Sequence, residues 1–394
     1  MMQKFILFLF VSLFFQTSKA QKYSNKIVTG AEQLDSYSSF LLNKKVALLV
    51  NQTSVIKKTH LVDTLSSIGV NIVKIFAPEH GFRGTADAGE KVKNGIDVKT
   101  GIPITSMYGA SKKPSKESMK DIDYVVFDIQ DVGARFYTYI SSLQYMMEAC
   151  AEANVPMLIL DRPNPNGFYV DGPILETRLK SFVGMQPMPI VHGMTVGEYA
   201  QMLNGEKWLS NKKTCKLKVV PCKNYDHTML YNLPIAPSPN LKSPSSVLLY
   251  PSLCLFEGTN VSVGRGTDHP FEVWGHPDFK NNGFSFTPES KEGAKHPPFE
   301  GRTCYGADLR LSPKDILKIT EGRISLSFLQ NAYKLSPNRA QFFNDFFDKL
   351  AGNSLLKTQI KQFFSEPDIR DSWEEGIRKF KGIRKKYLLY KDFE

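Results

Sequence analysis

Four short runs of apolar residues, separated by longer amphipathic segments, constrain the fold of this chain more than any other feature. Each run is uniformly apolar, as expected of a parallel strand that is buried on both faces. Residues 60–68 and 138–153, which lie between the runs, carry apolar side chains at helical spacing. This alternation is typical of a βαβ series and predicts a doubly wound α/β domain. The predicted strands are residues 46–50, 71–76, 124–127 and 157–160.

A polar residue follows each predicted strand: Asn51, Glu79, Asp128 and Asp161 in turn. In open α/β sheets, ligands bind outside the carboxyl ends of the strands, so we expect the functional site at this edge. Glu79 is the most informative of the four. It lies in the segment FAPEHGFRG (residues 76–84), which places a carboxylate, an imidazole, a guanidinium and two glycines directly after a buried strand.

The N-terminus has the pattern of a secretory signal peptide. Lys4 is followed by an apolar run over residues 5–15 and by a small-x-small cleavage pattern at residues 18–20. We therefore predict a signal peptide at residues 1–20 and a mature chain of 394 − 20 = 374 residues, long enough for two domains. No cysteine near the cleavage pattern could carry a lipid, and no later segment predicts a membrane span. We expect an exported protein, periplasmic or secreted, without a membrane anchor.

The basic composition does not by itself indicate a partner. The formal charge is +11, or 11 − 2 = +9 without the two lysines of the signal peptide. We interpret this charge as a solvated surface and expect no nucleic-acid partner. Five cysteines are too few for a disulfide scaffold, although export permits one bridge, for which Cys215 and Cys222 are the favoured pair. No C-x-x-C or H-E-x-x-H spacing indicates a zinc site.

The chain changes character after a proline-rich stretch at residues 233–251, where we expect irregular structure and a domain boundary. We predict an α/β domain at residues 22–244 and a smaller α+β domain at residues 245–394. Thr195 and Glu198 have the spacing of a capping box, so we interpret Glu198 as a helix cap. In the second domain we predict helices at residues 315–319, 324–333, 340–350 and 372–380, and a terminal strand at residues 387–390.

Seven motifs occur in order along the chain and resemble those of a known family. They are NQT (51–53), APEHGFRG (77–84), DIQDVGARFYTY (128–139), DRPNP (161–165), HGMT (192–195), PSPN (237–240) and EGTNVSVGRGT (257–267). This series closely resembles the NamZ family of exo-β-N-acetylmuramidases. The resemblance covers nearly the whole mature chain, from about Val46 to Tyr390.

The resemblance implies both a fold and an activity. The implied fold is a Rossmann-like N-terminal domain and a smaller C-terminal domain, with the active-site cleft between them. The implied activity is release of N-acetylmuramic acid from the non-reducing end of peptidoglycan-derived, β-1,4-linked fragments. We therefore expect muramyl saccharides as partners.

Glycoside hydrolysis requires a proton donor for the leaving oxygen and a second carboxylate that activates water or attacks the sugar. The family's motif places the first role on Glu79, which we predict to be the acid or acid/base. The alternative is a loop glutamate paired with Arg83. The second carboxylate stays open among Asp128, Asp131 and Glu257.

Muramic acid differs from glucosamine by a lactyl ether that carries a carboxylate. A guanidinium can bind a carboxylate through two hydrogen bonds, so Arg135, Arg162 and Arg265 are candidates for this contact. The alternative for each arginine is that it holds its own loop through backbone carbonyls. Tyr108, Tyr137 and Tyr139 are candidates for stacking on a sugar ring, although at their spacing we favour core positions. The other candidate substrate contacts are Asn51, His80, Arg83, Gln130, Asp131, Tyr137, Asn164, His192, Asn240 and Asn260.

Several other activities lack their sequence signals. No G-x-G-x-x-G follows the first strand, and neither a phosphate-binding P-loop nor G-x-S-x-G occurs, so we expect no nucleotide cofactor and no serine hydrolase. Two alternatives remain. One is a metal-assisted deacetylase or phosphoesterase with His80, Asp128, Asp161 and His192 as ligands. The other is a non-catalytic module that binds cell-wall sugars.

Overall fold

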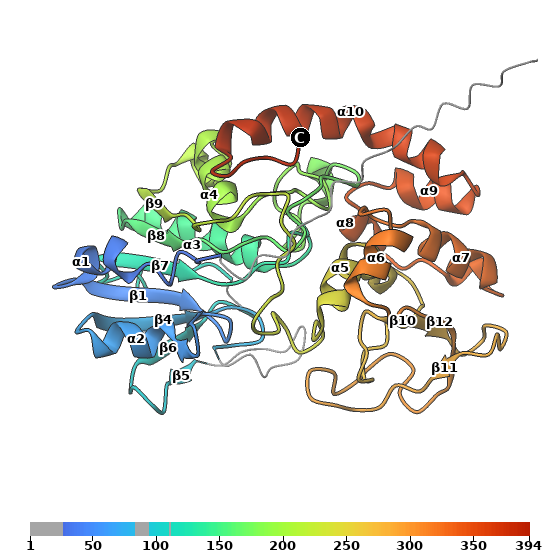
Figure 1. The fold of residues 1–394 in the computed structure, drawn as a ribbon, viewed down its shortest axis with the longest axis horizontal. Helices are drawn as coiled ribbons and strands as arrows, with labels where there is room; N and C mark the ends of the chain where they lie inside the picture. The colour runs from blue at the N-terminus through green and yellow to red at the C-terminus, as the bar shows by residue number, and fades with distance from the viewer. Residues whose placement is uncertain (1–26, 83–93, 110–111) are drawn as a thin grey trace, which may run out of the picture.

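The structure is a computed structural model that describes residues 27–82, 94–109 and 112–394. Figure 1 shows an N-terminal domain built on one large sheet beside a C-terminal domain of helices around a small sheet. The predicted signal peptide and Arg83 both lie outside the described residues. In the described part of the chain, no helix combines the length and the apolarity needed to cross a membrane.

The N-terminal sheet has seven strands, and β1, the first of them along the chain, lies at the centre of the sheet. All neighbouring strands are parallel except β5, which pairs antiparallel with β6. The four predicted strands are confirmed as β1, β4, β7 and β8, and the sheet extends beyond them on both sides. In sheet order the strands are β5 (Gly95–Ile96), β6 (Pro103–Ser106), β4 (Asn71–Ala77), β1 (Lys45–Val50), β7 (Tyr124–Asp128), β8 (Met157–Leu160) and β9 (Leu217–Val220).

Helices cover both faces of this sheet, which explains why its central strands are apolar throughout. Ala47 and Leu49 of β1 belong to the core cluster that includes α3 and α4, whereas Val46 and Leu48 belong to the cluster that includes α2. Successive side chains of a strand point to opposite faces, so a strand between two helical layers has no polar face. The helices predicted over residues 60–68 and 138–153 are confirmed. The helices of this domain are α1 (Ser38–Leu41), α2 (Leu61–Ser67), α3 (Tyr139–Ala153) and α4 (Val196–Gly205).

The C-terminal domain combines a three-stranded antiparallel sheet with six helices in the described residues. Its core is continuous with that of the first domain, because Leu249, Phe256 and Trp274 belong to the same cluster as Phe136 and Tyr137. The two domains therefore share buried surface rather than touching only at a linker. The elements are α5 (Pro244–Leu253), β10 (Val273–His276), β11 (Ser285–Phe286), β12 (Cys304–Asp308), α6 (Pro313–Ile319), α7 (Ser327–Leu335), α8 (Phe347–Ala351), α9 (Leu355–Lys361) and α10 (Glu366–Arg384).

Two predictions for this region are wrong. The proline-rich stretch was expected to be irregular, yet it contains α5, which begins at Pro244 after the N-cap Ser243. Proline is well suited to a first helical turn, where no hydrogen bond from its nitrogen is needed. A single helix over residues 340–350 does not form either. Asn344 instead donates to the backbone oxygens of Glu257 and Thr259 and holds this segment against the loop that follows α5.

The C-terminal tail returns to the N-terminal domain and does not form the predicted strand. Figure 1 shows α10 running from the C-terminal domain towards α4. Arg384, at its end, donates to the backbone oxygen of Gly193 at 2.6 and 3.0 Å. The hydroxyl of Tyr390 then donates to the buried carboxylate of Asp161 at 2.6 Å. Side-chain hydrogen bonds, rather than a strand ladder, hold residues 387–390 in place.

Glu198 is a helix cap, as predicted. Its carboxylate accepts a hydrogen bond from the backbone nitrogen of Thr195, and the Thr195 hydroxyl accepts one from the backbone nitrogen of Glu198, which completes a capping box. The other carboxylate oxygen of Glu198 lies 3.0 Å from Nε2 of His227 and accepts from the backbone nitrogen of Leu389 at 2.9 Å. This glutamate therefore also anchors the tail.

The favoured disulfide is wrong, because all five cysteines are free thiols. Cys215 precedes β9 and Cys222 follows it. The four residues of this strand alone span about 13 Å, well beyond the reach of a disulfide. The neighbour of Cys215 is instead Cys150 at the end of α3. A hydrogen bond to Cys215, together with burial, raises the pKa of the Cys150 thiol.

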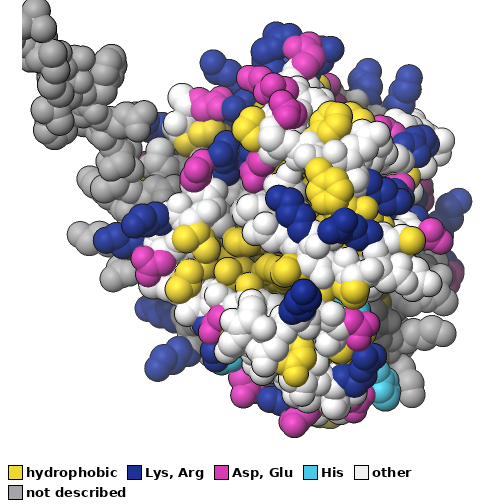
Figure 2. All heavy atoms as spheres, turned by 90° about the vertical axis from the view of Figure 1, so that its right-hand side faces the viewer, with side chains coloured by type: hydrophobic (Ala, Val, Ile, Leu, Met, Phe, Trp, Pro, Cys, Tyr) yellow, Lys and Arg dark blue, Asp and Glu magenta, His cyan; other side chains and the backbone are white. Residues whose placement is uncertain are grey.

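Hydrophobic side chains reach the surface on one side of the C-terminal domain. Figure 2 shows them among lysine and arginine side chains on the face turned away from the N-terminal sheet. The exposed hydrophobic residues of α7, α9 and the turn after α9 include Leu335, Leu355, Phe363 and Phe364. The guanidinium of Arg339 lies 5.2 Å from the centre of the Phe363 ring.

Candidate active site

A cavity of about 890 Å³ is lined by residues of both domains. It borders the carboxyl edge of the large sheet, because Glu79 follows β4, Tyr108 follows β6, and Thr138 begins the helix after β7. The C-terminal domain contributes Glu257 and Arg265, together with residues 293–298. The cavity thus contains two of the predicted carboxylates, one from each domain.

The turn after β4 presents Glu79 to the cavity. The backbone nitrogen of Gly81 donates to the oxygen of Pro78 at 3.0 Å, and His80 adopts a left-handed conformation with a φ of 66°. The hydroxyl of Thr138 donates to Oε2 of Glu79 at 2.7 Å. Since Thr138 is the N-cap of the fifteen-residue helix α3, the positive end of that helix lies beside the carboxylate.

Tyr108 is a second partner of Glu79. Burial raises the pKa of the Tyr108 hydroxyl. The negative charge of Glu79 and the hydrogen bond between Tyr108 and Glu79 raise this pKa further. The tyrosine is therefore a neutral donor at physiological pH. Together with Thr138 it fixes the position of the Glu79 side chain.

Glu257 is held by Arg265 through two nitrogen–oxygen contacts of 2.7 Å. The arginine lies in a tight turn whose glycines, Gly264 and Gly266, have φ angles of 74° and 82°. Its guanidinium also lies 5.1 Å from the centre of the Phe271 ring. Burial lowers the pKa of Arg265, but the charge of Glu257 and its hydrogen bonds with Arg265 outweigh this effect and raise the pKa overall. The pair is a fixed ion pair at the cavity wall.

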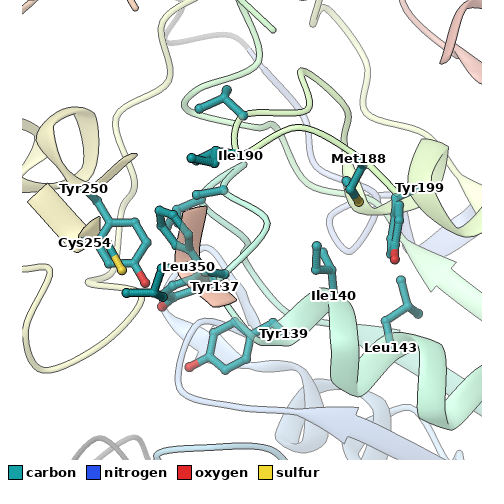
Figure 3. Packing of buried hydrophobic residues seen from close by; sticks show 14 of the residues in the cluster. Tyr137, Tyr139, Ile140, Leu143, Met188, Ile190, Tyr199, Tyr250, Cys254 and Leu350 are labelled. Carbon is teal, nitrogen blue, oxygen red and sulfur yellow. The ribbon is translucent and has the colours of Figure 1, made fainter. Parts of the chain in front are cut away.

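Aromatic side chains join the two domains at the base of the cavity. The Tyr250 ring makes edge-on contacts with Phe136, Tyr137 and Phe271, at centroid distances of 5.4, 5.6 and 5.1 Å. Figure 3 shows Tyr250 of α5 and Cys254, which follows α5, facing Tyr137 and Tyr139 near the beginning of α3. Tyr137 and Tyr139 both line the cavity and are also buried in the core.

Asp128 and Arg162 do not line the cavity and are bound to each other. Arg162 donates from Nε to Oδ1 of Asp128 at 2.5 Å and from Nη2 to Oδ2 at 2.9 Å, and it also donates to the oxygen of Val55. Both side chains are almost completely buried. The geometry gives neither residue a substrate contact, so it does not support Asp128 as the second carboxylate or Arg162 as a lactyl ligand.

Arg135 connects the two domains instead of binding a ligand. It is fully buried and donates to the backbone oxygens of Pro173, Met188 and Leu350 at 2.7 to 3.1 Å. Burial lowers the pKa of its guanidinium to about 9. Because Leu350 belongs to α8, this arginine ties the loop before α3 to the C-terminal domain.

Three more predicted contacts support the loops at the strand ends. The Asn51 side chain accepts from the backbone and the hydroxyl of Thr53, and Gln130 donates to the backbone oxygens of Asp131 and Pro163. Asp131 accepts from the backbone nitrogen of Gly133 at 2.7 Å. Burial raises the pKa of Asp131 to about 7 despite that hydrogen bond. None of the three lines the cavity.

His80 lines the cavity beside Glu79. The other predicted contacts, Asn164, His192, Asn240 and Asn260, are outside the cavity lining, although Asn240 shapes it. Asn240 donates to the backbone oxygen of Gly293 at 2.8 Å and so holds the loop at residues 293–298. Asn164 donates to the oxygen of Met194, and the backbone nitrogen of Asn260 donates to the oxygen of Phe342. Burial and nearby positive charges lower the pKa of His192 to about 3, so this histidine is neutral.

Sequence reasoning missed several residues of the cavity. Thr138, Lys112 and Phe182 come from the N-terminal domain, whereas Lys295 and His296 come from the C-terminal loop held by Asn240. Lys112 follows β6, so recognising β6 as a sheet strand would have placed it at the functional edge. Thr138 lies within the 128–139 motif but was not selected as a candidate, and no motif in the sequence marks the other three.

The predicted metal ligands do not converge. Within residues 27–82, 94–109 and 112–394, no three or more His, Cys, Asp or Glu side chains are placed to hold a metal ion. Asp128 is bound to Arg162, and Asp161 accepts from the hydroxyls of Thr195 and Tyr390. The observed geometry therefore gives no support to the metal-assisted alternative.

Hydrolysis of a glycosidic bond uses two carboxylates, and this cavity contains one from each domain, Glu79 and Glu257, which points to a glycoside hydrolase. Comparison with known proteins agrees with this class. Residues 46–245 match the family model described as "Exo-beta-N-acetylmuramidase NamZ, N-terminal", and residues 248–390 match the corresponding C-terminal model. The chain belongs to the NamZ family of exo-β-N-acetylmuramidases, as its sequence motifs predicted.

Three individual proteins illustrate the similarity. The peptidoglycan beta-N-acetylmuramidase NamZ of Bacillus subtilis (strain 168) is 38% identical over 396 residues, which cover 95% of this chain and 93% of that protein. A crystal structure of a DUF1343 family protein from Bacteroides fragilis NCTC 9343 has a TM-score of 0.86 and 48% identity, covering 93% of this chain and 99% of that one. A second DUF1343 structure from the same strain has a TM-score of 0.77 and 31% identity at the same coverage.

Proposed function

We propose that this protein is an exo-acting glycoside hydrolase that releases N-acetylmuramic acid from the non-reducing end of β-1,4-linked peptidoglycan fragments. Membership of the NamZ family supports this activity. The observation that carries the proposal is the position of Glu79, which the family's motif selects and which lines a cavity shared by both domains. The cavity volume of about 890 Å³ suits a small saccharide, because ligand sites commonly occupy 300 to 1,000 Å³.

We assign Glu79 as the acid or acid/base and Glu257 as the second carboxylate. Hydrolysis needs a proton for the leaving oxygen and a carboxylate that activates water or attacks the anomeric carbon. Glu257 fits the second role better than Asp128 or Asp131, because it alone of these three lines the cavity. Its ion pair with Arg265 holds the carboxylate in a fixed position at the cavity wall.

We interpret the large sheet as Rossmann-like and the cavity as the cleft of the active site. Counting only the parallel strands in chain order, the sheet reads 3-2-1-4-5-6, which is the order of doubly wound dinucleotide-binding sheets. Ligands of such sheets bind at the carboxyl edge, near the point where the strand order reverses. Glu79 and Thr138 lie at that edge, after β4 and β7.

Two further proposals concern the whole chain. The N-terminal pattern of residues 1–20 supports export and a periplasmic or secreted location. The two matched family regions support a division of the mature chain near residues 244 and 245. We propose peptidoglycan-derived muramyl saccharides as the substrates that this exported enzyme turns over.

Incubation of the mature chain with two isomeric disaccharides tests whether it cleaves the glycosidic bond and which sugar it requires at the non-reducing end. N-Acetylmuramyl-β-1,4-N-acetylglucosamine should yield free N-acetylmuramic acid, whereas the disaccharide with N-acetylglucosamine at the non-reducing end should stay intact. Glu79→Gln should abolish the release while the protein stays folded, and Glu300→Gln, at an exposed glutamate, should leave it unchanged. Absence of release by the wild type, or equal cleavage of both disaccharides, would refute the proposal.

A further inference from the structure

The cavity needs a cation for the carboxylate that distinguishes muramic acid from glucosamine. The three arginines that the sequence suggested for this contact are already engaged. Arg135 and Arg162 lie outside the cavity lining, and Arg265 is paired with Glu257. A substrate carboxylate would have to compete with Glu257 for Arg265. Among the residues that the structure describes, this contact therefore falls to another cation of the cavity.

Lys112 lines the cavity and has no acidic partner among the described residues. Its ammonium lies 5.6 Å from the centre of the Tyr108 ring and 5.1 Å from that of Phe182. Contacts of this kind orient a cation without neutralising its charge. Lys112 thus presents a positive charge to the cavity that a ligand anion can pair with.

The aromatic rings that hold this lysine are themselves fixed. Phe182 stacks on Tyr145 of α3 with an interplanar angle of 10°, and the hydroxyl of Ser141 donates to the backbone oxygen of Phe182 at 2.7 Å. Tyr108 is hydrogen-bonded to Glu79. The ammonium is therefore positioned by two side chains of a rigid wall, one of which also contacts the proposed acid.

The position of Lys112 also suits the chemistry of the sugar. The lactyl ether of muramic acid is attached to C3, two carbons from the anomeric C1 at which the glycosidic bond breaks. When C1 lies at Glu79, the lactyl carboxylate must lie within a few ångströms of it. The Tyr108 side chain contacts both Lys112 and Glu79, so the two charged groups lie on either side of one ring.

We propose that the ammonium of Lys112, held between Tyr108 and Phe182, binds the lactyl carboxylate and selects muramic acid over glucosamine. This inference rests on the proposed function, since it assigns a specificity residue to the same cavity. A charge-assisted hydrogen bond of this type corresponds to a factor of about 10 to 100 in affinity.

Binding of the free sugar tests the lysine without requiring turnover. N-Acetylmuramic acid and its methyl ester, which lacks the negative charge, are titrated into the full mature chain and followed by NMR. The wild type should bind the acid about 10- to 100-fold more tightly than the ester. Lys112→Met should lose that preference by weakening the acid alone, and Lys112→Arg should recover part of it.

Two control variants separate this role from general effects of charge and stability. Lys116→Met removes an exposed lysine outside the cavity lining, and Lys295→Met removes the lysine of the opposite loop. Both should keep the preference for the acid. The inference is overturned if Lys112→Met retains the preference, if it weakens acid and ester equally, or if Lys295→Met is the variant that loses it.

The two proposals fail in different ways. Cleavage of the disaccharide by a wild type that binds acid and ester equally would refute only the role of Lys112. A preference for the acid without cleavage of any muramide would refute only the hydrolase.

Discussion

Removing Arg162 should destabilise the protein strongly while leaving its chemistry nearly unchanged. Arg162→Met removes both hydrogen bonds to Asp128, of 2.5 and 2.9 Å, and leaves a fully buried carboxylate without a cation. Breaking a buried pair by removal of one partner costs about 3 to 5 kcal/mol, most of which is the desolvation of the orphaned charge. Asp128 belongs to β7 and Arg162 to the loop after β8, so the substitution destabilises the central part of the sheet.

The corresponding change in melting temperature is measurable by calorimetry or circular dichroism. A domain of roughly 200 residues loses about 2 to 4 °C per kcal/mol, so Arg162→Met should melt about 6 to 20 °C below the wild type. The double variant Asp128→Leu/Arg162→Met should recover most of this loss, because an apolar pair carries no desolvation penalty. Both variants should retain kcat within a few-fold below their melting temperatures.

Two results would refute this reasoning. If Arg162→Met kept its melting temperature but lost kcat a hundredfold or more, the pair would belong to the catalytic machinery. If the double variant were no more stable than the single one, the cost would not come from the unpaired charge of Asp128.

Three further predictions test other side chains whose hydrogen bonds or burial the structure defines. Burial raises the pKa of Asp131 to about 7, so the folded state keeps a proton that the unfolded state loses, and the free energy of unfolding should fall as the pH rises from about 4 to 7. Asp131→Asn should remove this part of the pH dependence. Melting-temperature differences between this variant and the wild type that are equal at pH 4.5 and pH 8 would contradict the prediction. Tyr390→Phe deletes the hydroxyl that donates to Asp161 at 2.6 Å and should cost about 1 to 3 kcal/mol in urea unfolding, whereas an unchanged midpoint would show that the tail is not anchored there. Thr138→Val removes the 2.7 Å hydrogen bond to Glu79 and should lower kcat about tenfold at unchanged stability, with Thr138→Ser restoring it; a full rate in the valine variant would mean that Glu79 needs no such support.

The central strands were predictable because both of their faces are buried. Strand β1, with five of its six residues buried, has an apolar run that only a strand between two helical layers explains. Strands β6 and β9 lie near or at the sheet edges and are mostly half-buried or exposed, so their sequences carry polar residues and no clear signal. Missing β6 also meant missing that Lys112 follows a strand of the sheet.

The candidate site was predictable only in part, for a related reason. Strand ends identify which residues reach the functional edge, and this placed Glu79 correctly beside the cavity. They do not reveal which side chains are already engaged. Asp128 is bound by an arginine 34 residues later in the chain, and Asp161 by a tyrosine 229 residues later. Such long-range pairs depend on the folded arrangement and leave no local pattern.

The assignment of Glu79 as the proton donor is the central claim, and a comparison of leaving groups tests it most directly. The kcat/KM of Glu79→Gln is measured against wild type on the N-acetylmuramyl-N-acetylglucosamine disaccharide and on 4-nitrophenyl β-N-acetylmuramide. A sugar alkoxide needs a proton to leave, whereas nitrophenolate does not. The account predicts a loss of about 10²- to 10⁴-fold or more on the disaccharide and a much smaller loss on the nitrophenyl substrate. Equal losses on both substrates, or full activity on the disaccharide, would contradict it.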